Sequence, residues 1–234
     1  MLASVDRRRV GVAAVGILLL AGVIASRAVV TRAPPPPRAG SASGAGSAQL
    51  MVLNGAESLS VSAASLGAEL YRAQVSPPGA AVITTPQTGE VEVSQGSSAS
   101  GSTHIAIQLS QRVEWTISIR GGTTTCSLDL SGLRLGGLTV SGGAQTMTLR
   151  LPEAVGKINV AVTGGATQLA VSAPSGVAMR VFAGAGVGSV TSSGPGLVVA
   201  DNSHLITFGN YAAAANSYAV RLTAGAATLR VIES

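Results

Sequence analysis

The sequence predicts an all-β body, a β-solenoid, that follows one N-terminal transmembrane helix. Three observations lead to this prediction: alternating apolar and polar residues, glycine-rich corners, and a repeat with a period of about 21 residues. Hydrophobic residues make up 46 % of the chain but aromatic residues only 3 %, so any core is built from Val, Leu, Ile and Ala. Thirty glycines and a charged fraction of 11 % are typical of a turn-rich β protein and not of a helical bundle.

The N-terminal residues predict a membrane anchor. Residues 1–9 form a basic lead with three consecutive arginines, and residues 10–30 are apolar apart from Arg27. The uncharged part, residues 10–26, would span about 25 Å as a helix, which is near the lower limit for crossing a bilayer. Because the denser arginine cluster comes first, we expect residues 1–9 in the cytoplasm and the body outside it. The alternative is a cleaved signal peptide and a secreted body.

A linker and one domain are predicted after the anchor. Residues 31–48 contain four consecutive prolines followed by Gly, Ser and Ala, which predicts an extended stalk with a flexible end. Residues 49–234 form the predicted domain, which has nine basic and nine acidic residues, so the net charge of +5 comes from residues 1–48. A neutral domain has no excess of positive charge for phosphates, and we therefore predict no nucleic-acid binding.

The repeat predicts that the domain is built from similar coils, each stacked on the next. GGAQTMTLRLPEAVG, from Gly142, reappears as GGATQLAVSAPSGVA, from Gly164, and GGTTTCSLDLS, from Gly121, precedes both with the same pattern. Near the C-terminus, YAVRLTAGAATLRV, from Tyr218, matches INVAVTGGATQLAV, from Ile158. A unit of about 21 residues cannot bury its own apolar face, which favours coils stacked on one another.

The alternation within each unit predicts which side chains face the core. In LRLP, Arg150 is expected to face water while Leu149 and Leu151 face the interior. Pro152 donates no hydrogen bond to a neighbouring strand and is expected to help end this one. The corner glycines permit the positive φ that a tight bend needs.

A β-sandwich remains the alternative fold, since it also has short alternating strands separated by turns. A sandwich does not require corner glycines at a constant spacing. Residues 49–120 fit the repeat less well, and GAELYRAQV and GEVEVSQG within them predict the strands of an atypical cap.

No catalytic, cofactor-binding or metal-binding residue is predicted, and no cofactor. His104 and His204 are the two histidines, and Asp201 lies near His204, but no G-x-S-x-G motif accompanies them. The glycines at 184, 186 and 188 suggest a nucleotide loop, yet Ser189 stands where the dinucleotide motif needs a further glycine. This segment therefore predicts a corner turn, and the chain is not expected to be an enzyme.

Five further positions have structural interpretations. Glu90 and Glu92 share one strand face, which indicates a solvent-facing surface because a metal site needs more ligands. Cys126 and Trp115 have the parity of apolar neighbours, which predicts core positions. Asp129 faces outward in L-D-L and is expected to fix a turn or an edge.

Exposed, grouped aromatic side chains would indicate a sugar-binding platform. Phe208 and Tyr211, in ITFGNYAAAAN, are the candidates, and their position near the C-terminus favours a cap.

The segment from Leu128 to Val181 resembles the toastrack-type β-solenoid domain of adhesin-like proteins. That domain is also similar to the C-terminal domain of bacterial cell-wall-active antibiotic stress-response membrane proteins. The shared marks are L-D-L, the G-G-A corner, L-x-L-P and P-x-G-V, and the resemblance extends over about residues 49–234. It implies a single-stranded, right-handed solenoid and a non-catalytic extracytoplasmic module, with no catalytic residues to carry over. Unlike the stress-response proteins, this chain has one predicted helix and not several.

These observations together predict a membrane-anchored, adhesin-like module for protein interaction, scaffolding or sensing in the bacterial cell envelope. The expected partner is an envelope protein or a second copy of the chain, and no small-molecule substrate is evident. The alternative is an envelope glycan- or lipid-binding domain, which grouped aromatic or arginine side chains on a flat sheet face would support.

Overall fold

The computed structural model describes residues 38–41, 46–97, 102–194, 197–199 and 205–233. They belong to a compact unit that begins at Pro35. The predicted basic lead and transmembrane helix, residues 1–9 and 10–30, lie outside the described residues. Within the described ranges, no helix is long and apolar enough to cross a membrane.

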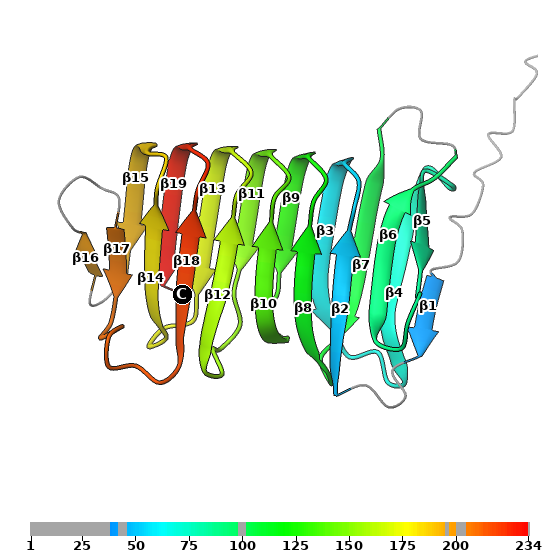
Figure 1. The fold of residues 1–234 in the computed structure, drawn as a ribbon, viewed down its shortest axis with the longest axis horizontal. Coiled ribbons are helices and arrows are strands. Elements are labelled where there is room, and N and C mark those ends of the chain that lie inside the picture. Colours follow the sequence, from blue (N-terminus) through cyan, green and yellow to red (C-terminus); the bar gives the residue numbers. More distant parts are fainter. Residues whose placement is uncertain (1–37, 42–45, 98–101, 195–196, 200–204, 234) are drawn as a thin grey trace, which may run out of the picture. The chain divides into compact units, whose positions relative to one another are not determined.

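The described residues form two β-sheets that enclose one hydrophobic core (Figure 1). The first, sheet A, consists in spatial order of β1 (Arg38–Ser41), β4 (Glu69–Ser76), β7 (His104–Ser110), β3 (Ala56–Ala64), β9 (Thr123–Asp129), β11 (Ala144–Arg150), β13 (Ala166–Ala173), β19 (Ala226–Glu233) and β15 (Val187–Ser193).

The second, sheet B, consists in spatial order of β16 (Leu197–Val199), β17 (Leu205–Phe208), β14 (Ala178–Ala183), β18 (Ser217–Leu222), β12 (Lys157–Val162), β10 (Arg134–Val140), β8 (Glu114–Ile119), β2 (Ser47–Val52), β6 (Glu90–Gln95) and β5 (Ala81–Thr84).

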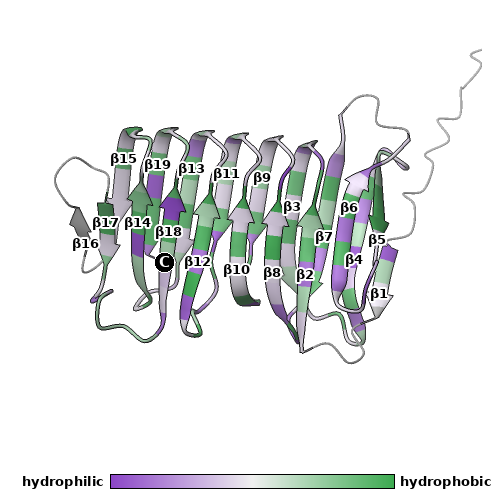
Figure 2. Ribbon diagram, in the orientation of Figure 1, coloured by the Kyte–Doolittle hydropathy of each residue, from purple (hydrophilic) through white to green (hydrophobic). Residues whose placement is uncertain are grey.

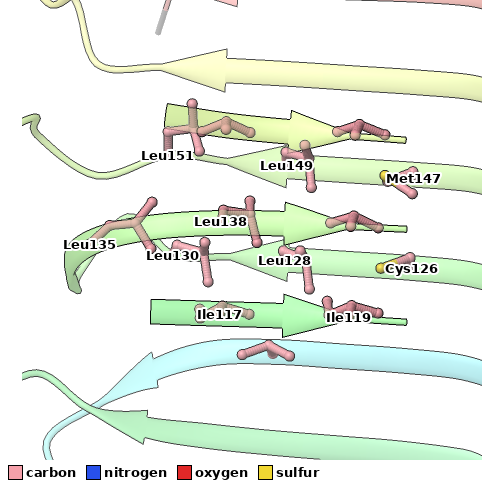
Figure 3. Close-up of a cluster of buried hydrophobic side chains, with 14 of the residues drawn as sticks. Ile117, Ile119, Cys126, Leu128, Leu130, Leu135, Leu138, Met147, Leu149 and Leu151 are labelled. Atoms are coloured by element: carbon pink, nitrogen blue, oxygen red, sulfur yellow. The ribbon is translucent and has the colours of Figure 1, made fainter. Parts of the chain in front are cut away.

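A strand of sheet B and the following strand of sheet A make one coil, and neighbouring coils pair in parallel. Cys126 of β9 lies opposite Met147 of β11, which lies opposite Leu169 of β13. The spacing of the repeat in the sequence is therefore the pairing register, and Figure 3 shows the side chains in matching columns. This parallel stacking confirms a solenoid and not a sandwich of antiparallel strands. The right-handed winding stays a prediction.

The first and last coils along the chain are not the first and last in space. The coil β2–β3 lies between β6–β7 and β8–β9, and the coil β18–β19 lies between β12–β13 and β14–β15. The match between the C-terminal segment and the middle of the chain is again a register, because Lys157 lies opposite Ser217 and Ala166 lies opposite Ala226. Both coils are thus held inside the stack by a neighbour on each side.

The alternation in the sequence divides each strand between core and solvent. In β11, Met147 and Leu149 are buried while Thr146 and Thr148 are exposed, and Figure 2 shows hydrophobic bands alternating with pale or purple bands along the strands. One core cluster contains the inward side chains of both sheets. Burial of this surface is the main force that holds one coil on the next.

Two large side chains in the core donate hydrogen bonds to backbone carbonyls. Trp115 is buried, as predicted, and its indole N–H donates to the carbonyl of Ser110 at 2.8 Å. The hydroxyl of Tyr218 donates to the carbonyl of Pro152 at 3.0 Å, and burial raises the pKa of the Tyr218 phenol. Each buried donor therefore has the partner that burial requires.

Glycine at the corners lets successive coils approach closely. A Cβ on Gly142 would overlap the carbonyl of Gly121, and one on Gly164 would overlap that of Gly142. The first residue of the Gly-Gly corner must therefore be glycine in these coils. The corresponding residue is alanine in the last two coils, at Ala224 before β19 and Ala185 before β15.

Antiparallel strands cover the end of the stack formed by residues from the first half of the chain. Here β1 pairs with β4, and β5 pairs with β6, both antiparallel. The predicted cap strands in GAELYRAQV and GEVEVSQG are confirmed as β4 and β6.

The sheets begin earlier than the sequence indicated, because β1 and the start of β2 fall inside the predicted linker, residues 31–48. A short edge strand needs only backbone pairing, so the segment RAGS carries no apolar alternation to reveal it.

Candidate functional site

A groove of about 650 Å³ lies on the outer face of sheet B, over β12, β18 and β14. Its lining includes Asn159, Arg180, Phe182, Tyr211 and Arg221. Four of these come from the three strands, and Tyr211 comes from the segment that joins β17 to β18.

Strand periodicity explains why these side chains meet. In β14, Met179 and Val181 are buried, so Arg180 and Phe182 point away from the core. The register then places Arg180 beside Ala219 of β18.

The next row of the same face has Phe182 of β14 beside Arg221 of β18, which lies opposite Ala161 of β12. In the first row, Asn159 of β12 lies opposite Ala219. Each of the two rows therefore contains one alanine, Ala219 or Ala161, next to longer side chains. The small alanine side chains create the hollow of the groove.

The segment after β17 holds Tyr211 over the sheet. Gly209 has a φ of +62°, which turns the chain out of β17. The carbonyl of Asn210 accepts from the backbone N–H of Ala214 at 3.0 Å, and the side-chain oxygen of Asn216 accepts from the N–H of Gly156 at 2.8 Å. The first bond closes a turn within the segment, and the second connects its C-terminal end to the residue before β12.

The groove is positively charged. The guanidinium of Arg180 lies 4.6 Å from the centroid of the Tyr211 ring, a cation–π contact that orients it. Three ion pairs occur among the described residues, and neither Arg180 nor Arg221 takes part in them. Within the described part of the chain, no carboxylate lines the groove. Two arginines are therefore available to an anionic group.

The structure changes the aromatic assignment made from the sequence. Phe208, in β17, is 1 % exposed and belongs to the core, and β17 pairs antiparallel with β14 near the end of sheet B. Tyr211 is half-buried, and the aromatic residue that accompanies it on the surface is Phe182, which is 44 % exposed. The sequence carried a signal for Phe182, because Val181 and Ala183 on either side have the parity of the core.

The structure describes the surroundings of several other positions considered in the sequence. Cys126 is buried, as predicted, and burial raises the pKa of its thiol to about 11. His104 is exposed, with its Nδ1 atom 3.2 Å from the Ser58 hydroxyl. Asp201 and His204 lie outside the described residues. Gly184 and Ala185 form the predicted corner turn.

The acidic residues considered in the sequence were Glu90, Glu92 and Asp129, and the structure shows the surroundings of each. Among the described residues, no group of three or more His, Cys, Asp or Glu side chains could hold a metal ion. Glu90 and Glu92 are half-buried on the same face of β6. The carboxylate of Asp129 accepts from the hydroxyl of Ser131 at 2.7 Å, which confirms its expected role in a turn.

A second surface feature is the edge of strand β15. Of the four strands at the sheet ends, β1 and β5 have 4 residues each and β16 has 3, and all three pair antiparallel with their neighbours. Strand β15 has 7 residues, pairs in parallel with β19, and has no second neighbour within the described ranges. Its sequence, VGSVTSS, contains neither a charged residue nor proline.

The comparison with protein families decides what kind of domain this is. The model of the N-terminal domain of toast_rack, DUF2154, matches residues 44–172, more than half of the chain. The chain belongs to this family. The resemblance noted in the sequence is thereby confirmed. A comparison of the toast-rack chain with curated proteins gives no match.

A comparison with solved structures gives two matches, one of which shows a similar fold. The chain is similar to a candidate cell adhesion protein from Clostridium sporogenes ATCC 15579, with 21 % sequence identity and a TM-score of 0.67, over 85 % of this chain and 98 % of the other. It also matches a candidate adhesin from Bacteroides fragilis NCTC 9343, with 9 % identity and a TM-score of 0.30, over 83 % of this chain and 95 % of the other. The first similarity establishes the two-sheet toast-rack architecture.

Proposed function

We propose that this toast-rack chain is a non-catalytic, adhesin-like module of the bacterial cell envelope. Residues 10–30 anchor it in the cell membrane as a single helix, and its body lies outside the cytoplasm. The body contacts an envelope protein, or a second copy of the chain, by strand addition at the free edge of β15. Adhesion is also what the name of the Clostridium sporogenes neighbour describes for that protein.

The edge of β15 is the observation that carries this proposal. Edge strands of soluble proteins are protected by short length, charge, proline or a covering segment, because their free backbone groups pair readily with another chain. Strands β1, β5 and β16 are short, whereas β15 is longer and uncharged. An added strand would gain main-chain hydrogen bonds along β15, as in other complexes formed by strand addition.

Lysines placed on the edge strand test the proposal. The change is Ser189→Lys with Thr191→Lys, both exposed on β15. The matched control is Thr146→Lys with Thr148→Lys on β11, which stand exposed in the same two rows of sheet A. We expect chemical crosslinking of the full chain in intact cells to lose its adducts in the β15 variant and to keep them in the β11 variant. Equal adducts in both variants would contradict binding at the edge.

Membrane anchoring has a separate test. A tag placed after Ser234 should be digested by protease added to spheroplasts, while a tag before Met1 should be protected. Digestion of neither tag would contradict the proposed orientation, and release of the body into the medium would favour a cleaved signal.

Glycan binding is a second candidate function, and the groove on sheet B favours it. The groove combines an exposed aromatic ring with two arginines on a flat sheet face. The sequence analysis gave grouped aromatic or arginine side chains on a sheet face as support for this alternative.

A further inference from the structure

We infer that the groove over β12, β18 and β14 binds an acidic glycan, a chain of sugar rings that carry carboxylate or phosphate groups. The inference rests on the second candidate function, glycan binding, and assigns its ligand class and its residues. It does not depend on an interaction at β15, which lies at the edge of the other sheet.

The aromatic component of the site is Phe182. Three large apolar side chains are exposed among the described residues, namely Val82, Val155 and Phe182, so Phe182 is the one aromatic ring of this group. Covering the exposed part of this ring with an apolar surface of a ligand would remove apolar area from water, which is favourable. The apolar C–H face of a sugar ring fits this flat surface, as aromatic side chains combine apolar area with a specific geometry.

The charged component is Arg221, which lies directly opposite Phe182 in the register of β18 and β14. Adjacent strands are about 4.8 Å apart, so a sugar on the ring is within reach of the guanidinium. Guanidinium groups bind carboxylate and phosphate through two parallel hydrogen bonds. A group of this kind on the sugar is therefore the complement of Arg221.

Arg180 supplies the second positive charge, one row further along β14. The Tyr211 ring lies 4.6 Å from the guanidinium of Arg180 and restricts its movement. Arg180 therefore loses less conformational freedom when its guanidinium binds a ligand. The distance between the two rows suits a ligand with repeated charges, because alternate residues on one face of a strand are about 6.6 Å apart.

The floor and far side of the groove suit a polymer of sugars. Ala161 and Ala219 leave the floor low, and the amide of Asn159 offers a donor and an acceptor beyond them. The volume of about 650 Å³ is within the range of sites for small ligands. A ligand whose rings follow one another across the sheet face would use both rows of side chains.

The same strands disfavour a peptide ligand. β12, β18 and β14 each have a paired neighbour on both sides, so their backbone groups are not available for strand addition. An acidic peptide would have to bind through side chains alone. We therefore assign the groove to an acidic glycan, and binding of a peptide is an outcome that the test must detect.

Calorimetric titration of the full chain in detergent tests the inference with four probes. Two are acidic, an oligogalacturonate and a phosphorylated oligomannose, because the same charge chemistry comes from carboxylate or phosphate. The third is the oligogalacturonate with its carboxylates reduced to alcohols, and the fourth is hexaglutamate. We expect at least one acidic glycan to bind at least tenfold more tightly than the reduced oligomer and hexaglutamate.

Variants locate the binding. Phe182→Ala and Arg221→Gln should each weaken binding of the acidic glycan at least tenfold. Val155→Ala and Arg230→Gln, which remove an exposed apolar side chain and an exposed arginine away from the groove, should leave it unchanged. All four positions are exposed, so the variants should unfold within a few degrees of the parent, as surface substitutions have small effects.

The outcomes separate the two proposals. Equal binding of the charged and reduced oligomers, weakened by Phe182→Ala, would keep glycan binding and overturn the acidic ligand. Binding of hexaglutamate alone would overturn both in favour of a peptide. No binding of either acidic glycan, or equal weakening by the control variants, would overturn the assignment of this groove.

Discussion

The two ends of the stack of coils are built differently. At the capped end, which comprises β1, β4, β5 and β6, both sheets finish in antiparallel strands of 4 residues. At the open end, sheet B finishes in the antiparallel pair β16–β17, whereas sheet A finishes in the parallel strand β15 of 7 residues. Only the capped end of the described stack thus has both sheet edges reduced to short strands that run against their neighbours.

The corners distinguish the middle of the stack from its ends. From Gly121 to Gly164, a first corner glycine allows backbone to lie against backbone, whereas this position is Asn54 towards the capped end and Ala224 and Ala185 towards the open end. The groove with Phe182 also lies towards the open end, on β14 and β18. The capped end therefore finishes in short antiparallel strands, and the open end carries the surfaces that we assign to binding. Proteins often place their binding surfaces in the less constrained parts of the fold.

The largest expected effect concerns the corner glycines. Gly142→Ala would place a Cβ against the carbonyl of Gly121, and we expect a loss of about 3 kcal/mol in the free energy of unfolding. Gly122→Ala should cost far less, because its Cβ would lie 3.5 Å from the carbonyl of Gly143. Ala224→Gly, at the open end, should change stability by no more than about 1 kcal/mol. Urea denaturation of the full chain measures all three, and equal effects of the two glycine variants would contradict close packing at the corner.

The second prediction compares one substitution at the two ends. Val93→Ala removes a buried side chain of β6 that lies opposite Ile83 of the edge strand β5, and we expect a loss of about 2 kcal/mol. Val190→Ala in β15 should cost below about 1 kcal/mol, because Val190 is only half-buried and has no strand beyond it in the described part of the chain. The same urea titration measures both. A larger loss at Val190 than at Val93 would mean that β15 is covered.

A hydrogen bond near the open end should have an intermediate effect. Tyr218→Phe removes the donor to the carbonyl of Pro152 while keeping the ring in the core, and we expect a loss of about 1 kcal/mol. Trp115→Phe is not a matched control, since it also changes the volume of the core. Thermal unfolding of the Tyr218 variant gives the measurement, and an unchanged midpoint would show that water replaces the lost donor.

The smallest expected effect concerns ion pairs at the surface. Glu69→Gln at the capped end breaks a 2.8 Å contact with Arg72, and both side chains are more than one third exposed. Asp129→Asn in the middle of the stack weakens a 3.9 Å contact between Asp129 and Arg150. Exposed pairs of this kind contribute about 0.5 kcal/mol or less. We expect both variants to remain within that range, and a loss several times larger at Glu69 would mean that the cap depends on charge.

The sequence predicted the regular part of the fold in detail, because one physical rule governs it. Coils that stack in register must repeat their inward residues, so the spacing of the matching segments correctly indicated that β11 lies between β9 and β13. We expected each coil to stack on the next along the chain, and the insertion of β18–β19 between β12–β13 and β14–β15 was not predicted. The strand β1 could not be predicted, since it pairs through its backbone and has no apolar pattern.

The candidate site was predicted only in part. The sequence indicated Tyr211 and paired it with Phe208, whereas the structure buries Phe208 and places Phe182 in the groove. Parity along β14 already placed Arg180 and Phe182 outside, but Arg221 is distant from Phe182 in the sequence and comes beside it only because β18 inserts next to β14. Contacts made by an inserted coil have no local signal. The membrane helix at residues 10–30 stays a prediction.

Site-specific photo-crosslinking tests the proposed role of the open edge most directly. A benzoylphenylalanine placed at Ser189 of β15, compared with one at Thr146 in the same row of β11, reports which part of sheet A touches another protein in intact cells. The proposal predicts a discrete adduct from position 189 and none from position 146. An adduct from position 146 alone, or from neither position, would contradict binding at β15.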